Sequence, residues 1–213
     1  MTAGTTSNIL VTKPVFGIGT TLDTDGVYDA TGSAVRTRKT VYWGGLKGDL
    51  SKGTITYEAD LTAYPPVGSW ERFSGFTVAI VDGHYVTAGV GVHNSDNKYR
   101  PYTFINGGNL NEGGATETVL GGSASMSASS QTIAADAAGT VIKLKVVLSE
   151  DALMFFVNGK LEQYYVLTGK SVVPFFGYLW QTGNASDNIS NVKIYGNGVE
   201  ACSHTFDGCT DTT

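Results

Sequence analysis

The sequence is poor in charge, in cysteine and in long apolar runs. Only 15% of the 213 residues are charged, while 28 are glycine, which argues against coiled coils and helical bundles. The net charge is -5 and no basic block exists beyond Arg36, Arg38 and Lys39, so neither nucleic acid nor an anionic membrane is expected as a partner. No apolar stretch approaches the ~18 residues that a membrane-spanning helix requires, so membrane insertion is not expected.

The amino terminus, residues 1–8, has neither a positive segment nor an apolar run, so no signal peptide is expected. Either the protein is made without a signal, as phage and viral structural proteins are, or it is a mature domain with an added Met. We expect residues 1–8 to be a flexible tail and residues 9–213 to form a single domain.

Two cysteines, Cys202 and Cys209, are separated by six residues. Two thiols with no further soft ligand make a poor zinc site. We expect a local disulfide between them, with two free thiols as the alternative.

The clearest pattern is the alternation of apolar and polar residues. It runs through Thr54–Thr62 and again through Val141–Leu148, which predicts strands with one buried face and one wet face. Asp82-Gly83 and Asn158-Gly159 lie between apolar runs, and such dipeptides favour tight hairpins because they tolerate positive φ.

The chain as a whole is predicted to be all-β, with little or no helix. The one helical candidate is Ile133–Ala138, which Gly139 ends. Two antiparallel sheets packed face to face would bury one side of each strand, so a β-sandwich is expected. Runs bounded by Gly, Pro, Asn and Asp predict about a dozen strands, near 9–18, 40–46, 54–62, 73–81, 85–93, 99–105, 115–120, 140–148, 152–157, 161–167, 172–180 and 189–196.

Four successive segments near the carboxyl end carry a more specific pattern. They are Ile142–Leu148, Leu153–Lys160, Val173–Trp180 and Ile189–Tyr195. Together they resemble the closing strands of concanavalin A-like and laminin G-like jelly rolls, with an Asn-Gly hairpin and a last strand ending in Tyr. The resemblance covers about 60 of the 213 residues. It implies a jelly-roll fold, which is shared by lectins, adhesion modules, glucanases, polysaccharide lyases and viral surface proteins.

The catalytic motifs of that superfamily are missing. A glucanase would carry Glu-x-Asp-x-x-Glu, whereas Glu58 and Asp60 are more simply the wet face of a strand. The residue types of a polysaccharide lyase are supplied by Arg72, His84, Tyr85 and Tyr99, but the Arg-x-Glu-type and Gln-x-His strand motifs of alginate lyases are missing. We therefore do not expect an enzyme, and a polysaccharide lyase is the enzymatic alternative.

Calcium is a candidate ligand of one loop. Asp23, Asp25 and Asp29 surround Gly26, so that several oxygens could reach one cation. A second candidate cluster combines Asn94, Asp96 and Asn97. Against both clusters stands the common use of Asp, Asn and Gly in turns.

Sugar binding requires exposed aromatic rings beside polar groups. Trp70 lies in a proline-containing loop, Trp180 and Gln181 precede a polar loop containing Asn184, and Tyr99 and Tyr102 flank Pro101. The candidate ligand-binding residues are therefore Trp70, Tyr99, Tyr102, Trp180, Gln181 and Asn184. The alternative is that these rings pack in the core.

The first hypothesis for function is a non-enzymatic, lectin-like module that binds glycans or cell-surface polysaccharides, or serves in adhesion, outside the cell or on a virion surface. The second is a self-assembling structural subunit, such as a capsid-decoration, tail or filament protein. The low charge density and the 1–8 tail favour self-association, because a tail can become ordered on a neighbour. The third is the jelly-roll lyase.

Overall fold

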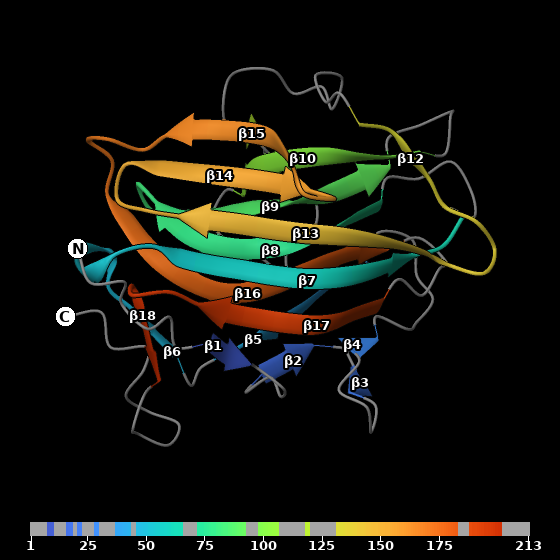
Figure 1. Cartoon of the computed structure of the whole chain (residues 1–213), viewed down its shortest axis with the longest axis horizontal. Helices are drawn as coiled ribbons and strands as arrows, with labels where there is room; N and C mark the ends of the chain where they lie inside the picture. The colour runs from blue at the N-terminus through green and yellow to red at the C-terminus, as the bar shows by residue number, and fades with distance from the viewer. Residues whose placement is uncertain are drawn as a thin grey trace.

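Backbone pairing divides the strands into two large antiparallel sheets, as expected for a β-sandwich. The computed structural model describes residues 8–10, 16–18, 21–22, 28–29, 37–43, 46–65, 72–92, 98–106, 118–119, 131–182 and 188–201, and structural statements refer to these. In Figure 1 one sheet lies in front of the other, with their strands running across the view.

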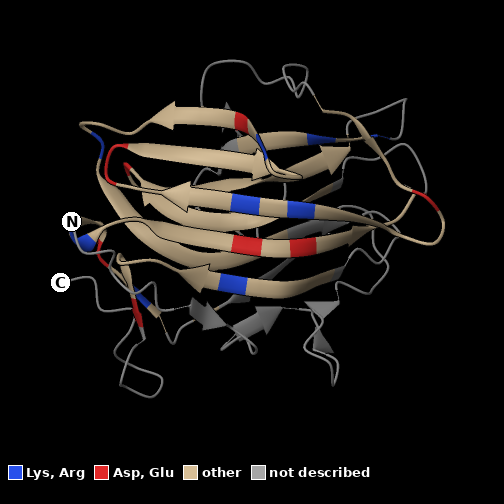
Figure 2. Cartoon of the chain, in the orientation of Figure 1, with Lys and Arg blue, Asp and Glu red and all other residues tan. Residues whose placement is uncertain are grey.

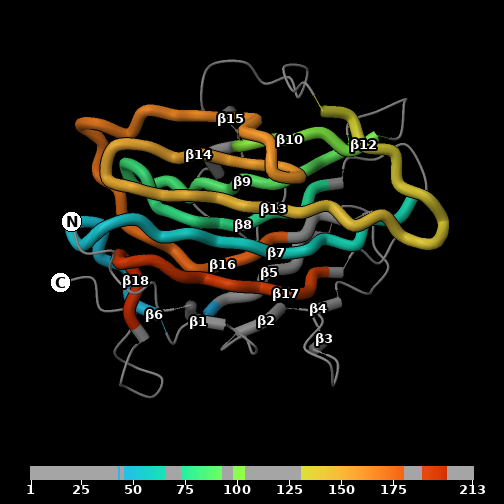
Figure 3. The backbone as a smooth tube through the Cα atoms, viewed as in Figure 1, coloured from blue at the N-terminus to red at the C-terminus, as the bar shows by residue number. Residues whose placement is uncertain are grey.

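The sheet nearer the viewer, sheet A, has the strand order β15-β14-β13-β7-β17-β4-β3, and β1 also pairs with β17. Its strands are β15 (Lys160–Val166), β14 (Ala152–Val157), β13 (Thr140–Leu148), β7 (Ile55–Ala63), β17 (Asn188–Tyr195), β4 (Tyr28–Asp29), β3 (Thr21–Leu22) and β1 (Asn8–Leu10). The tube in Figure 3 runs from β13 through β14 to β15, which places consecutive strands side by side at one edge.

The sheet behind it, sheet B, has the order β11-β10-β9-β8-β16-β5-β2, and β12 also pairs with β10. Its strands are β11 (Thr118–Val119), β10 (Lys98–Asn106), β9 (His84–Val92), β8 (Arg72–Val81), β16 (Val172–Thr182), β5 (Thr37–Tyr42), β2 (Phe16–Ile18) and β12 (Ile133–Ala134).

A small third ribbon pairs β6 (Leu46–Gly48) with β18 (Val199–Ala201). The 3-10 helix η1 (Leu50–Lys52) follows β6. Lys52 Nζ lies 2.6 Å from Glu200 Oε1, so an exposed ion pair joins η1 to β18.

The core lies between sheets A and B because alternate side chains of each strand turn inward. Along β7, Ile55, Tyr57 and Leu61 are fully buried, as the alternation predicts. The Tyr57 ring packs 5.7 Å from Phe76 of β8 and 5.9 Å from Phe176 of β16, measured between ring centroids. Aromatic contacts across the sandwich therefore join the two sheets.

The Tyr57 hydroxyl strengthens this connection. It donates toward the backbone oxygens of Val78 and Phe175, at 3.1 and 3.0 Å. Burial raises the pKa of Tyr57 well above its usual value, so the phenol stays protonated and remains a donor.

Both predicted hairpins are present. Asp82 and Gly83 have φ of 49° and 82°, and Asn158 and Gly159 have φ of 51° and 80°. Each dipeptide connects two strands that pair directly, β8 with β9 and β14 with β15. The prediction of an antiparallel two-sheet sandwich is confirmed, with strands at or beside each of the dozen expected runs.

Two local predictions are wrong. Ile133–Ala138 was the helical candidate, but Ile133 and Ala134 form β12, because their backbones pair with Tyr99 and Lys98 of β10. The single strand expected over 9–18 is two short strands in different sheets, since β1 pairs with β17 and β2 pairs with β5.

Tyr57→Phe should lower the free energy of unfolding by about 1 kcal/mol or more, because the two carbonyls lose a buried donor. Urea unfolding measures the change. The matched control is Tyr164→Phe, whose ring is 56% exposed and which should have almost no effect. Equal losses in both variants would contradict a bridging role for the Tyr57 hydroxyl.

Candidate functional site

The predicted sugar-binding residues are distributed over several parts of the chain. Trp70 and Asn184 lie outside the described residues, so these two predictions stand as made. Trp180 and Gln181 lie near the end of β16, where their backbones pair with Ser74 and Phe73 of β8. Strand β16 also pairs with β5, so both residues lie between two neighbouring strands of sheet B. Only their backbones are described, and their sugar-binding roles stay predictions.

Tyr99 and Tyr102 require a correction. Both were expected in an exposed aromatic segment, but they lie within β10 and are 0% and 8% exposed. The Tyr99 hydroxyl donates to the backbone oxygen of Tyr64 at 3.0 Å. Pro101 does not end the strand, so both rings are held in packing and neither is free to stack on a sugar.

The predicted calcium and disulfide residues fall mostly outside the described parts. Asp29 lies in β4, opposite Thr21 of β3, and is placed only by its backbone. The other residues of the two candidate calcium clusters and both cysteines lie outside the described ranges, so the calcium and disulfide predictions stay predictions. These residues are Asp23, Asp25, Asn94, Asp96, Asn97, Cys202 and Cys209.

The described residues contain no group of three or more His, Cys, Asp or Glu side chains arranged to hold a metal ion. Nor does any helix among them have the length and hydropathy that a membrane crossing needs.

The outer face of sheet B carries glycine where β8 and β9 pair. Gly75 of β8 and Gly89 of β9 face each other, and a Cβ on either would overlap the backbone of the facing strand. Since these residues have no side chains, Phe73 and Tyr102 meet across β9 with ring centroids 5.9 Å apart. With Leu179 they form a second buried cluster, separate from the main core. This face therefore uses its aromatic rings for packing.

The outer face of sheet A is different, and we call it the front face. It consists of the outward side chains of β15, β14, β13, β7 and β17. Figure 2 shows its charge pattern, in which acidic positions on β7 lie between basic positions on β13 and β17. The front-face residues are Leu161, Tyr164, Val166, Met154, Phe156, Lys143, Lys145, Val147, Glu58, Asp60, Asn191, Lys193 and Tyr195.

A hydrogen-bonded network occupies the centre of the front face. Glu58 Oε1 accepts from the Tyr195 hydroxyl at 2.8 Å and lies 3.2 Å from Lys145 Nζ. Asn191 Nδ2 donates to Asp60 Oδ2 at 2.6 Å. A carboxylate can accept about four hydrogen bonds. Glu58 and Asp60 thus keep acceptor positions for hydroxyl groups of a ligand.

The network also sets protonation states. Partial burial raises the pKa of Tyr195, and the hydrogen bond to Glu58 raises it further. Burial opposes the charge of Lys145, but the interactions with Glu58 and Tyr195 together outweigh burial and raise the pKa of Lys145. At neutral pH Tyr195 is therefore a neutral donor and Lys145 a cation.

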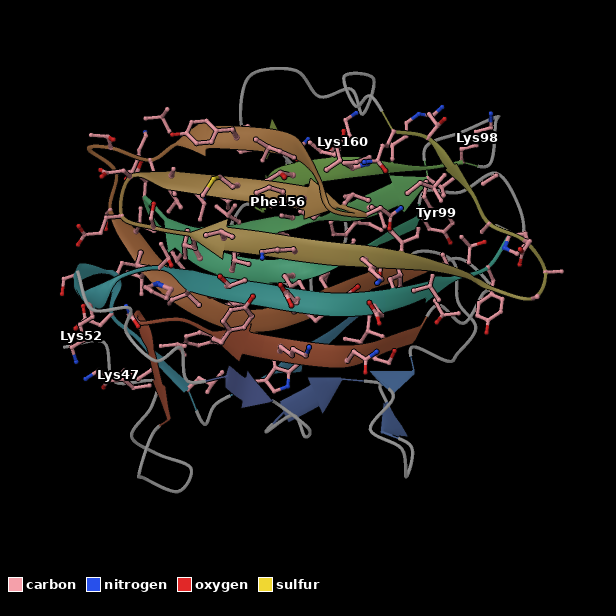
Figure 4. All side chains as sticks on the ribbon, viewed as in Figure 1. Lys47, Lys52, Lys98, Tyr99, Phe156 and Lys160 are labelled. Carbon is pink, nitrogen blue, oxygen red and sulfur yellow. The ribbon has the colours of Figure 1, made fainter. Side chains whose placement is uncertain are left out.

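An apolar stripe lies beside this network, on β14 and β15. Tyr164 is 56% exposed, Val166 65% and Leu161 46%. By register Tyr164 lies opposite Met154, and Leu161 lies opposite Phe156. Phe156 and Met154 are half-buried. Figure 4 labels Phe156 on β14, on the side of the sheet toward the viewer.

Sequence reasoning missed these aromatic residues. Phe156 and Tyr164 were assigned to strands without being considered as ligands. The available signal was the alternation itself, because Leu153, Phe155 and Val157 are buried and Phe156 must therefore face outward.

Glu58→Gln keeps a hydrogen-bond acceptor but removes the negative charge, so the pKa of Tyr195 should fall toward the usual tyrosine value. Because folding raises this pKa, the neutral phenol stabilises the native state fully below pH ~10, and this contribution is lost at higher pH. NMR titration of the tyrosine ring carbons measures the pKa of Tyr195. The resonance is assigned by its absence from the spectrum of the Tyr195→Phe variant. An unchanged pKa in the Gln variant would count against the Glu58 contact.

Comparison with known proteins shows the fold. No family model and no curated protein matches the chain. Among solved structures, the Emp46p carbohydrate recognition domain in its potassium-bound form superposes with a TM-score of 0.54 at 9% identity, over 84% of this chain and 86% of that one. Carbohydrate binding module CBM66 from Bacillus subtilis gives 0.51 at 14% identity, over 88% and 97%.

Alginate lyase AlyC3 is also similar, with a TM-score of 0.52 at 11% identity over 81% of this chain and 76% of that one. At these identities the similarity is one of fold. The jelly-roll β-sandwich fold that the C-terminal strands predict is thus confirmed for this chain.

Proposed function

We propose that this chain is a glycan-binding module whose front face holds the sugar. The observation that carries the proposal is the combination of exposed Tyr164 and half-buried Phe156 with the Glu58 and Asp60 carboxylates on one face of one sheet. An aromatic ring can stack on the apolar face of a sugar, while the carboxylates accept from its hydroxyls.

The fixed positions of the polar groups favour binding. Tyr195 and Lys145 hold Glu58, and Asn191 holds Asp60, before any ligand arrives. Groups that are already ordered lose less side-chain entropy when they bind. The fold supports the same function, since similar structures include a carbohydrate recognition domain and a carbohydrate binding module.

Tyr164→Ala and Phe156→Ala should each weaken glycan binding about tenfold, which corresponds to about 1.4 kcal/mol of lost stacking and burial. A glycan array identifies the ligand, and isothermal titration calorimetry then measures the affinities. Val173→Ala is the matched control, because Val173 is an apolar side chain that is 41% exposed on β16 of the other sheet, and it should bind as the wild type does.

Two results would overturn the proposal. One is an array on which no glycan binds at millimolar concentration. The other is unchanged affinity in both aromatic variants while Val173→Ala also binds normally, which would place the ligand away from the front face.

The exposed apolar stripe also favours a second candidate function, self-assembly. Leu161, Tyr164 and Val166 lie on β15, which pairs only with β14 among the described strands of sheet A. Edge strands of this kind are open to pairing with another copy. Light scattering distinguishes the two functions, because a self-assembling subunit changes mass with concentration and a glycan-binding monomer does not.

A further inference from the structure

One row of side chains crosses the whole front face at right angles to the strands. Leu161 lies opposite Phe156, Phe156 opposite Lys145, Lys145 opposite Glu58, and Glu58 opposite Lys193. The row thus passes over β15, β14, β13, β7 and β17 in turn. With neighbouring strands about 4.8 Å apart, its four spacings measure about 19 Å.

A second row runs parallel to the first, two residues further along most strands. Its chemistry changes in the same direction, from apolar on β15 and β14 to polar on β7 and β17. By register its members are Tyr164, Met154, Val147, Thr56 and Tyr195, of which Thr56 is buried and Tyr195 supplies the polar end. The front face therefore has an apolar end and a polar end, and both rows repeat this order.

The separation of the two ends decides the size of the ligand. Phe156 and Glu58 lie two strands apart, about 10 Å, with Lys145 between them. A pyranose unit is about as long as one strand spacing. A single sugar can therefore contact the ring or the carboxylate, but it cannot contact both.

We infer that the front face binds a linear glycan chain of about four sugar units lying across the strands, and not a single sugar. The inference rests on the proposed glycan-binding function. One end of the chain stacks on Phe156 and Tyr164. The middle units donate hydroxyl hydrogen bonds to Glu58 and Asp60, and the far end reaches Lys193.

Chain length is the direct test. Calorimetric titration would use cello-, manno-, xylo- and fructo-oligosaccharides of one to six units. For the series that binds, affinity should rise by a factor of about 100 between one and four units, with little gain beyond. A single sugar that binds within twofold of the tetramer overturns the inference but leaves the proposed function intact. No binding in any series, and none on the array, overturns the proposed function itself.

Variants at opposite ends of the front face, on β15 and on β17, provide a second test. Tyr164→Ala and Lys193→Ala should each weaken binding of the four-unit chain by about tenfold. For a two-unit chain only one of the two variants should have this effect, because two units cannot reach from β15 to β17. Both residues are exposed, so neither substitution should prevent folding.

Lys47→Ala is the matched control for Lys193→Ala. Lys47 is an exposed lysine of β6, and Figure 4 shows it well away from Phe156. Its removal should leave every affinity unchanged. Equal losses for the two-unit chain in both end variants, or no loss for the four-unit chain in either, would overturn the inference.

Discussion

Contact between the inner faces of the two sheets is the interaction on which the rest of the structure depends. Tyr57 lies at its centre, with its ring against Phe76 and Phe176 and its hydroxyl directed at two backbone oxygens of sheet B. Burial of aromatic and aliphatic side chains is the main stabilising term in such a sandwich. Since the inner faces are used for packing, the outer faces and the loops are what remain for a ligand.

The two outer faces differ because their side chains differ in size. On sheet B, Gly75 and Gly89 let the strands approach closely, and the space above them is filled by Phe73 and Tyr102. On sheet A, long side chains stand at the outward positions and hold one another by hydrogen bonds. Glu58 is the centre of that arrangement, because a hydroxyl and an ammonium both bind the same carboxylate oxygen.

The fold limits the function without choosing it. Structures similar to this chain include a carbohydrate recognition domain, a carbohydrate binding module and an alginate lyase, all at 14% identity or less. A jelly roll can support any of these activities, so the function depends on which residues face outward. On the front face those residues are aromatic rings followed by fixed polar groups, which is the chemistry that sugar chains require.

Local features of this protein could be predicted from the sequence because they depend on near neighbours. The alternation through β7 and β13 and the Asp82-Gly83 and Asn158-Gly159 hairpins were all found in this way. They depend on the two-residue period of a strand and on the backbone freedom of single residues. The jelly roll was also predicted, from the order of the last four strands.

Only the tertiary structure decided which outward residues meet. Phe156 and Glu58 are far apart in sequence, yet β13 brings them to the same row of sheet A. Tyr102, predicted as a ligand, is buried because β9 presents Gly89 and Gly91 beneath it and Phe73 closes over them. Alternation tells which side of a strand a residue occupies, but the partner of that strand is set by long-range pairing. The packing of the core between the two sheets selects that pairing. The pairing in turn brings the residues of the front face together.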